Sequence, residues 1–151
     1  MIAKTQHPLI DTSTWKETDK AYLAAFLDTD GCITIVVDSK RGVKSPYLGF
    51  TNAHEETINF VNCLIKKHVQ KRLTVSGLTL YIINIYRTAD VRAVLLALLP
   101  YIQGKKRQAA LILSLCEKRI AGTKITLDDV RMVRHINALH NTNTTRQRKI
   151  I

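Results

Sequence analysis

Residues 23–31 read Leu-Ala-Ala-Phe-Leu-Asp-Thr-Asp-Gly, an apolar run that ends in two acidic residues and a glycine. Leu23, Phe26, Leu27 and Asp30 fall at positions i, i+3, i+4 and i+7, which form one face of a helix. That spacing carries a carboxylate to the end of a surface suited to burial, and the glycine lets the backbone turn sharply out of the helix. The negative end of the helix dipole lies there too, so a bound cation would relieve the repulsion. The alternative for so short a pattern is a core helix with an acidic end.

Length and charge narrow the class of protein. The chain has 151 residues, of which 46% are hydrophobic, and this suits one globular domain spanning residues 1–151. It carries 23 Lys and Arg against 12 Asp and Glu, a net charge of +11, which favours a polyanionic partner, either nucleic acid or an anionic membrane. A membrane partner is not expected, because the longest apolar run, residues 91–99, contains Arg92 and is far too short for a span. Residues 1–19 are polar and mixed in charge, unlike a signal or transit peptide.

The cysteines and histidines give no sign of a disulfide framework or a zinc site. Cys32, Cys63 and Cys116 stand alone without a C-x-x-C pair, which is typical of reduced core thiols in an intracellular protein. The five histidines show no metal-ligand spacing. We expect no small-molecule substrate.

Hydrophobic periodicity predicts the order of the elements. The first helix runs to about Asp30 from a cap at Thr18 or Thr14. The remaining elements, in order, are a strand at 33–38, a basic turn at 40–45, a strand at 46–51, a helix at 55–69, strands at 72–76 and 79–86, and helices at 90–99 (capped from Thr88), 107–120 and 127–139. An N-terminal arm (1–17) and a basic polar tail (141–151) flank them. The pattern predicts an α+β fold with one four-stranded antiparallel sheet.

One face of that sheet packs under helices, and the other is too polar for a core. The open face presents Thr34, Val36, Asp38, Lys40, Tyr47, Gly49, Thr51, Arg72, Thr74, Ser76, Ile82 and Asn84, with Arg41 and Lys44 at the basic hairpin tip. A twisted ribbon of strands can enter a major groove and contact base edges. A merely solvated sheet face is the alternative, but the net charge favours contact with DNA.

Residues 23–31 resemble the signature motif of the LAGLIDADG homing endonucleases. Seven of the nine positions are identical or conservative; Ala25 replaces the usual glycine, and Thr29 a small residue. The motif occurs once, and single-motif chains of that family act as homodimers. The resemblance therefore implies a homodimer that joins through this helix, at Leu23, Ala24, Ala25, Leu27 and Asp28. The extra methyl group of Ala25 should push the two helices slightly apart.

The resemblance extends to residues outside the motif, roughly from 19 to 148, and implies the α-β-β-α-β-β-α fold with a saddle-shaped sheet and extra C-terminal helices. Phe50-Thr51-Asn52 matches a stretch whose glutamine borders the active site, so Asn52 takes that role with a shorter amide. Residues 99–109 resemble a segment whose lysine reaches the scissile phosphate, and Lys105 is its counterpart. Residues 138–144 resemble a stretch that contacts the DNA backbone, which implies such contacts for Thr142, Asn143, Thr144 and Arg146.

This family cuts both DNA strands with a divalent metal, which the resemblance implies here as Mg²⁺. Asp30 of each subunit would hold the metal, with the backbone carbonyl of Thr29 as a second ligand. Lys105 would stabilise charge and Asn52 would orient solvent, whereas Asp28 lies about 200° around the helix and is expected to be structural. The implied product is a staggered cut at a long pseudo-palindromic site.

Two other functions stay open. Some members of the family are maturases that assist intron RNA folding, and a pure maturase does not cut duplex DNA. Others are non-catalytic DNA-binding proteins, which usually lose the last acidic residue of the motif; Asp30 is present here. By the same resemblance, the compartment is an organelle (chloroplast or mitochondrion) or a microbial cytoplasm.

Overall fold

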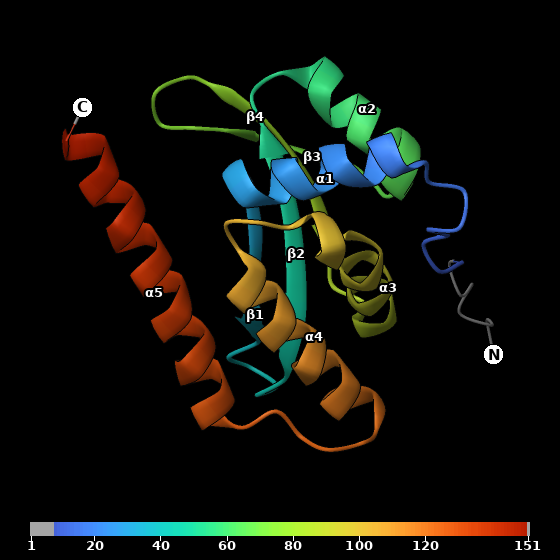
Figure 1. The fold of residues 1–151 in the computed structure, drawn as a ribbon, viewed down its shortest axis with the longest axis vertical. Helices are drawn as coiled ribbons and strands as arrows, with labels where there is room; N and C mark the ends of the chain where they lie inside the picture. The colour runs from blue at the N-terminus through green and yellow to red at the C-terminus, as the bar shows by residue number, and fades with distance from the viewer. Residues whose placement is uncertain (1–7, 151) are drawn as a thin grey trace.

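The structure is a computed structural model that describes residues 8–150, with side chains as far as residue 141. Figure 1 shows helices and strands alternating in a single mixed arrangement, in agreement with the predicted α+β class. The elements in chain order are α1 (Glu17–Thr29), β1 (Gly31–Val37), β2 (Lys44–Asn52), α2 (Glu55–Ile65), β3 (Val69–Leu73), β4 (Thr79–Ile85), α3 (Thr88–Leu98), the short 3-10 turn η1 (Leu99–Tyr101), α4 (Lys106–Ile120) and α5 (Leu127–Ile150).

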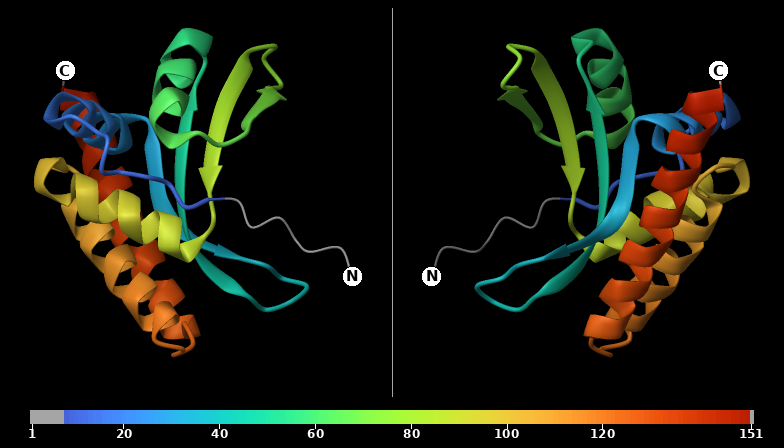
Figure 2. Two further views of the ribbon diagram at one scale, coloured as in Figure 1. Left: turned by 90° about the vertical axis from the view of Figure 1, so that its right-hand side faces the viewer. Right: turned by 90° about the vertical axis from the view of Figure 1, so that its left-hand side faces the viewer.

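The four strands form one antiparallel sheet in the order β1-β2-β4-β3, so β2 and β4 lie at its centre. Side chains alternate between the two faces: Ile33 and Ile35 of β1 are buried, while Thr34 and Val36 between them face away from the core. In Figure 2 the tips of the two hairpins diverge, one toward each end of the sheet. The helices α3 and α4 cover one face of the sheet, and the hairpin tips bend toward the other. The chain thus leaves one face of a curved sheet open.

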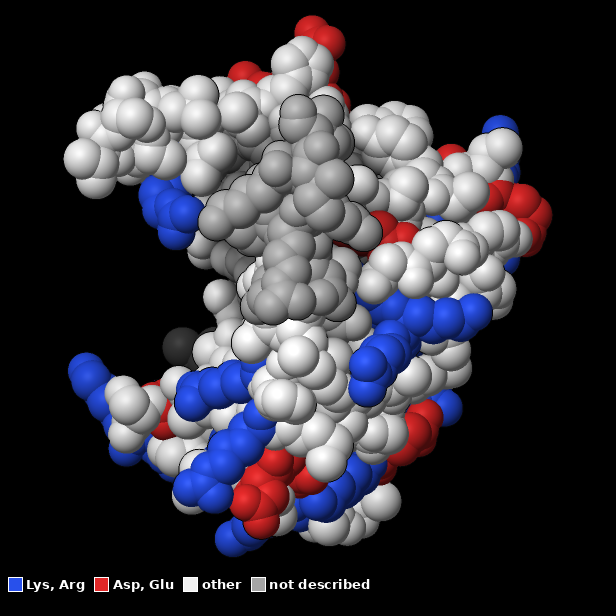
Figure 3. Space-filling model, turned by 60° about the vertical axis from the view of Figure 1, so that its left-hand side comes forward, with Lys and Arg blue, Asp and Glu red and all other residues white. Residues whose placement is uncertain are grey.

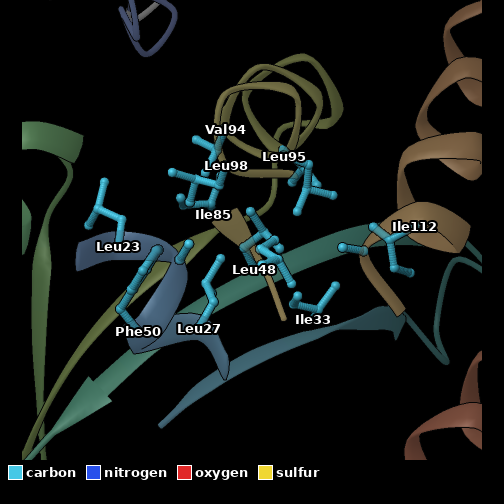
Figure 4. Close-up of a cluster of buried hydrophobic side chains, with 14 of the residues drawn as sticks. Leu23, Leu27, Ile33, Leu48, Phe50, Ile85, Val94, Leu95, Leu98 and Ile112 are labelled. Carbon is cyan, nitrogen blue, oxygen red and sulfur yellow. The ribbon is translucent and has the colours of Figure 1, made fainter. Parts of the chain in front are cut away.

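The core lies between the covered face and the helices. Both Phe50 and Leu48 of β2 are fully buried. Phe50 lies against Leu23 and Leu27 of α1, and Leu48 lies between Ile33 and Ile85 of the neighbouring strands (Figure 4). Burying large apolar side chains in this way contributes about 1.5–3 kcal/mol each relative to exposure. Because α1 crosses the top of β2, its C-terminal end is fixed where β1 begins.

The described part of the N-terminal arm is packed on the body. Ile10 is buried and its N–H donates to Asp90 Oδ1 at 2.8 Å, while Lys67 Nζ binds the other carboxylate oxygen at 2.9 Å. Trp15 is also buried, and its ring N–H donates to the carbonyl of Leu64. Residues 1–7 of the predicted arm lie outside the described residues. No helix in the described part of the chain is both long enough and apolar enough to cross a membrane.

Several predicted boundaries are wrong. The α1 cap is not Thr14 or Thr18: the helix follows Lys16, whose N–H donates to Asp19 Oδ2. Helix α2 ends at Ile65, not at residue 69, because Lys66 adopts a left-handed conformation that stops the helix.

Two further boundaries shift as a result of local sequence ambiguity. Strand β3 occupies Val69–Leu73, so it begins and ends earlier than the predicted 72–76, and α5 continues to Ile150 instead of ending at residue 139.

Of the cysteines, Cys116 is buried as expected, but Cys32 and Cys63 are exposed.

Candidate active site and nucleic-acid interface

Asp30 lies directly after α1, with its side chain exposed at the edge of the open sheet face. Its backbone N–H still donates to the Phe26 carbonyl, so the last helical turn fixes its position. Asn52, the last residue of β2, points its side-chain amide at Asp30, with Nδ2 3.5 Å from Oδ2. Asn52 Oδ1 accepts the His54 N–H at 2.8 Å, and this bond turns the NH₂ group toward the carboxylate. The structure therefore brings Asp30 and Asn52 together.

Asp28 is only two residues away but has a different environment. Its two carboxylate oxygens accept the backbone N–H groups of Gln103 and Lys105 at 2.8 and 2.9 Å. These bonds tie the loop after η1 to the end of α1. These contacts are consistent with the expected structural role of Asp28, and its placement in a dimer interface stays a prediction.

Lys105 is partly buried at the end of α1, close enough to Asp30 for their charges to interact. Its ammonium group donates to the carbonyls of Leu27 and Gly31 at 2.7 and 2.6 Å. A cation at the C-terminal end of a helix is favourable because it offsets the negative end of the dipole. Burial lowers the pKa of Lys105, while Cys32, Asp28 and Asp30 act in the opposite direction. With two N–H donors directed at carbonyls, one remains for another acceptor.

Gly31 is required by close packing, and this corrects the prediction that it serves to turn the chain. Its φ is not in the left-handed region, unlike those of Gly42, Gly77 and Gly122. A Cβ at residue 31 would lie 2.5 Å from Leu27 Cα, which no real contact tolerates. The absence of a side chain therefore lets β1 start directly against α1 and sets the position of Asp30.

The donor set at the end of α1 suits a hard cation only in part. Asp30 offers an exposed carboxylate, and carboxylate and carbonyl oxygens are the ligands that Mg²⁺ prefers. The Thr29 hydroxyl donates to the Ala25 carbonyl at 3.0 Å, so only the carbonyl of Thr29 stays a predicted ligand. In the described part of the chain, no group of three His, Cys, Asp or Glu side chains could hold a metal ion. Among the described residues, one protomer thus offers Asp30 and the carbonyl of Thr29, and the other positions around an Mg²⁺ would be filled by water, DNA or a second copy of the chain.

The exposed face of α1 differs from the predicted dimer surface. Leu23, Ala24 and Leu27 are fully buried in the protomer, so assigning them to an interface was wrong. Their side chains are taken up by the sheet below. The residues that face outward are instead Tyr22, the predicted Ala25, and Thr29, again at helical spacing.

This outward face continues onto α2. The Tyr22 ring meets Phe60 edge-on with centroids 5.0 Å apart, although both rings are exposed, at 41% and 46%. A shallow hollow beside them is lined by Ala25, Asp30 and Asn52 among others. The exposed aromatic pair and the carboxylate of Asp30 thus lie on the same side of the molecule. The sequence signal for this face was the i, i+3, i+7 spacing of Tyr22, Ala25 and Thr29.

Most of the predicted open-face residues lie on the open face of the sheet. Alternation with buried neighbours and the strand register place there Thr34, Val36, Tyr47, Gly49, Thr51, Arg72, Ile82 and Asn84. Figure 3 shows this side as a hollow between the β3–β4 hairpin above and a lower edge where Lys and Arg gather.

Four predicted open-face residues lie in turns instead of strands. Asp38 and Lys40 belong to the β1–β2 turn, where Asp38 Oδ1 accepts the N–H groups of Lys40 and Arg41. Thr74 and Ser76 belong to the β3–β4 turn and bond each other through their hydroxyls at 2.9 Å. Strands β1 and β3 end earlier than predicted, at Val37 and Leu73, because each turn forms its own hydrogen bonds there.

A chain of polar side chains crosses the open face. Tyr47 donates its hydroxyl proton to Asn84 Oδ1 at 2.5 Å, and Asn84 Nδ2 donates to Gln70 Oε1 at 3.1 Å. Gly49 lies beneath the Tyr47 ring, where any Cβ would collide with the phenol. Burial, with Tyr86 and Cys32 adding to it, raises the pKa of Tyr47 to about 12, while Arg72 opposes the shift. Gln70 was missed because the sequence pattern drew the preceding helix up to residue 69.

Helix α5 borders β1, where Asn137 Nδ2 lies 3.3 Å from both the Ile33 carbonyl and the Thr34 hydroxyl. The predicted contacts at Thr142, Asn143, Thr144 and Arg146 lie outside the residues whose side chains are described.

Comparisons with known proteins identify the fold. No family model matches the chain. No curated protein matches it either. Among solved structures, the homing endonuclease I-CvuI, in complex with a DNA target that is not cleaved in 2 mM Mg, superposes with a TM-score of 0.55 at 23% identity over 68% of this chain and 68% of that one. The archaeal intron-encoded homing endonuclease I-Vdi141I, complexed with DNA, gives 0.61 at 11% identity over 83% and 84%.

A third structure, the group I intron-encoded homing endonuclease I-CeuI complexed with DNA, gives a TM-score of 0.54 at 17% identity over 77% of this chain and 59% of that one. The fold is thus that of the LAGLIDADG homing endonucleases, which confirms the predicted fold.

Proposed function

We propose that this protein is a homodimeric, metal-dependent endonuclease that cuts double-stranded DNA at a specific site. The observation that carries the proposal is the placement of Asp30. An exposed carboxylate lies at the end of α1, beside the Asn52 amide and near the Lys105 ammonium, at one end of an open sheet face in a chain of net charge +11. A carboxylate, a cation and a polar face for the duplex are the parts that phosphodiester hydrolysis requires.

Each residue has a defined part in this proposal. Asp30 and the carbonyl of Thr29 would hold Mg²⁺, which supplies an activated water and neutralises charge on the phosphate when bound. Asn52 directs its NH₂ group at Asp30, 3.5 Å from Oδ2, where it would help to orient solvent beside the carboxylate. Lys105 places a positive charge within the site and keeps one N–H donor for a phosphate oxygen.

A two-fold assembly would add a second Asp30 carboxylate to the donor set that one protomer offers. The outward face of α1, formed by Tyr22, Ala25 and Thr29 with Phe60 of α2, adjoins Asp30. Pairing two copies through this face would bring two Asp30 carboxylates close together beside a two-fold axis. Such a dimer has one site for each DNA strand and reads a pseudo-palindromic target. The proposed interface is therefore the exposed face of α1 and not the face that carries the buried Leu23, Ala24 and Leu27.

The test uses a supercoiled plasmid that carries the DNA junction obtained by joining the two sequences that flank the coding region. Asp30→Asn keeps the shape of the side chain but removes its charge, so cleavage in Mg²⁺ should be lost while binding to the junction persists. Asp11→Asn, which removes the same charge from an exposed side chain of the N-terminal arm, serves as the matched control and should cut normally. If Asp30→Asn cuts as well as the unmodified protein, the assignment of the site is wrong.

The same assay tests the dimer. Co-expressed, differently tagged copies, one unmodified and one Asp30→Asn, are purified through both tags. A two-fold enzyme with one site per strand should convert the plasmid to nicked circles and stop there. Linear product from this mixed species, or failure to recover both tags together, would count against the shared arrangement. An unmodified protein that binds its intron RNA but never cuts the duplex would favour the maturase alternative.

A further inference from the structure

A second charged feature lies at the opposite end of the sheet from Asp30. It is a concavity of about 380 Å³ between the β1–β2 turn and the loop that joins α4 to α5. Four of the residues that line it are cations, namely Arg41, Lys44, Arg119 and Lys124, and no Asp or Glu is among the described residues of its lining. We call this feature the flank pocket. Concentrated positive charge in a hollow attracts anions more strongly than the same charge on a flat surface.

The flank pocket is held together by specific contacts. Arg119, in the last turn of α4, donates from Nη1 to the Lys44 carbonyl at 2.9 Å and to the Ser45 hydroxyl at 2.6 Å. This joins the loop after α4 to the start of β2. Ile125 is buried beneath the loop, and Gly122 makes the turn with a φ of +84°. The Arg119 guanidinium is thereby fixed in place, with N–H groups beyond Nη1 available to a ligand.

The nearest acidic side chains are already paired. Glu117 binds Arg92 at 2.5 Å, and Asp129 binds Lys118 at 2.8 Å. Asp38 lies 4.0 Å from Arg41, an exposed pair at long distance that costs little to separate. Acidic side chains of the chain itself therefore neutralise little of the positive charge of the flank pocket, which can attract an anionic partner.

The position of the flank pocket relative to Asp30 suggests the partner. Lys44 is the first residue of β2 and Asn52, which contacts Asp30, is the last. At about 3.4 Å per residue, the two ends of this strand lie about 27 Å apart. Successive phosphates of a DNA strand are spaced about 3.4 Å along the helix axis, so that distance corresponds to about eight base pairs. The sheet connects the two sites without interruption.

We propose that the flank pocket binds a backbone phosphate of the duplex about eight base pairs from the position of cleavage, beyond the stretch that faces the open sheet. The inference rests on the proposed function insofar as the partner is duplex DNA. Flexible Lys and Arg side chains in a hollow suit a phosphate, because backbone contacts position the protein without reading bases. The flank pocket therefore adds affinity and sets the length of the bound site, but not its sequence.

The experiment measures equilibrium binding as a function of salt, without Mg²⁺. Arg41→Gln/Lys124→Gln removes two cations of the flank pocket and leaves Arg119, which also holds the turn. Lys16→Gln/Lys66→Gln removes two exposed charges outside it and serves as the matched control. A long duplex extends about 14 base pairs to each side of the cut position and a short one about 6, so that only the long duplex reaches the flank pocket by the spacing above.

On the long duplex, the slope of log affinity against log salt should be smaller by about 0.9 for the flank-pocket variant than for the control, which corresponds to one phosphate contact. On the short duplex the two variants should bind alike. Equal slopes on the long duplex would overturn the inference. A loss that appears only with a folded RNA probe, and not with duplex, would overturn the assignment of DNA as the ligand.

Failure of the proposed function is distinguishable from failure of this inference. Binding is measured without cleavage, and the same comparison can be made in the Asp30→Asn background. A protein that never cuts but shows the predicted change in slope retains the flank pocket as a phosphate site. A protein that cuts normally with no change in slope lacks it.

Discussion

The two ends of strand β2 differ in how tightly their polar groups are held. At the Asn52 end, Lys105 bonds two carbonyls, Asp28 bonds two backbone N–H groups, and Gly31 touches α1 directly. At the Lys44 end, cations surround an open concavity and only Arg119 is fixed by several bonds. Chemistry on a phosphodiester needs groups held to a fraction of an ångström, whereas contact with backbone phosphates tolerates mobile side chains. The difference teaches that rigidity, more than charge, marks the end where the chemistry is proposed.

The glycines of the two ends give the largest expected contrast. Gly31→Ala places a methyl group against the backbone of Leu27, so α1 or β1 must move, and we expect a loss of about 3 kcal/mol in the free energy of unfolding. Gly42→Ala, in the β1–β2 turn, meets nothing within 4 Å and suffers only from its φ of +66°, at about 1 kcal/mol. Urea denaturation of both variants measures the difference.

Cleavage activity sharpens this contrast. Gly31→Ala should also lower activity at temperatures where the variant stays folded, because Asp30 is the preceding residue. Gly42→Ala, at the other end of β2, should lower activity much less. Equal losses of stability for the two variants would show that the Asn52 end is not packed more tightly than the Lys44 end.

Two carboxylates that each accept two backbone N–H groups provide the next contrast. Asp28 accepts those of Gln103 and Lys105 across 75 or more residues of sequence, and Asp38 accepts those of Lys40 and Arg41 within its own turn. Asp28→Asn turns an NH₂ group toward one of the N–H donors and leaves it unsatisfied, at a cost of about 1–3 kcal/mol. Asp38→Asn leaves an amide oxygen that can accept the same bonds in an exposed turn. It should lower the free energy of unfolding by well under about 1 kcal/mol.

Thermal or urea denaturation measures both. Because Asp28 also holds the loop that carries Lys105, its variant should slow cleavage while leaving some activity, in contrast to Asp30→Asn. An Asp28→Asn protein as stable as the Asp38→Asn protein would mean that the loop after η1 does not depend on this carboxylate.

The sequence was sufficient for the features that depend on local periodicity. The alternation of Ile33 and Ile35 with Thr34 and Val36 identified both faces of β1, because a strand must present successive residues to opposite sides. The order of helices and strands followed from the same kind of pattern. The placement of Asn52 beside Asp30 came from the family resemblance, and the 3.5 Å contact is consistent with it.

The features that were missed depend on contacts between distant parts of the chain. Leu23, Ala24 and Leu27 were assigned to a dimer surface because the pattern shows that a helical face is buried but not what buries it; their partner is the chain's own sheet. The apolar residue Val69 fits the pattern of the preceding helix as well as that of a strand. The helix ends at Lys66, whose left-handed conformation the sequence does not signal, because a lysine is not typical of that position.

The flank pocket shows the same limit. Arg119 and Arg41 are separated by about half of the chain, and only the folded structure brings α4 against the β1–β2 turn. In the same way, a glycine required by close packing looks identical in sequence to one required by a turn, which is why Gly31 was assigned the wrong reason.

Tyr47 lies between the two ends of β2 and should show the smallest effect. Tyr47→Phe removes the hydroxyl that donates to Asn84, at a cost of about 1 kcal/mol or less, because the site is only half-buried and water can replace the bond. The neighbouring Tyr86→Phe is the control, since that ring lies 5.1 Å away and is exposed.

The pH dependence of stability separates the two variants. The pKa of Tyr47 is raised to about 12 by burial, so in the folded protein the phenol stays protonated where an unfolded chain, with its pKa near 10, releases the proton. The contribution of this group is fully present below about pH 10 and is lost as the pH rises toward 12, so the unmodified protein should lose stability over that interval. Tyr47→Phe should lose less than the unmodified protein over the same interval, and Tyr86→Phe should follow the unmodified protein, as measured by urea denaturation at a series of pH values. An equal loss of stability for Tyr47→Phe and Tyr86→Phe between pH 10 and 12 would contradict this prediction. It would mean that the Tyr47 phenol is not shielded from water. The polar chain from Tyr47 through Asn84 to Gln70 would then be looser than the contacts at the Asn52 end.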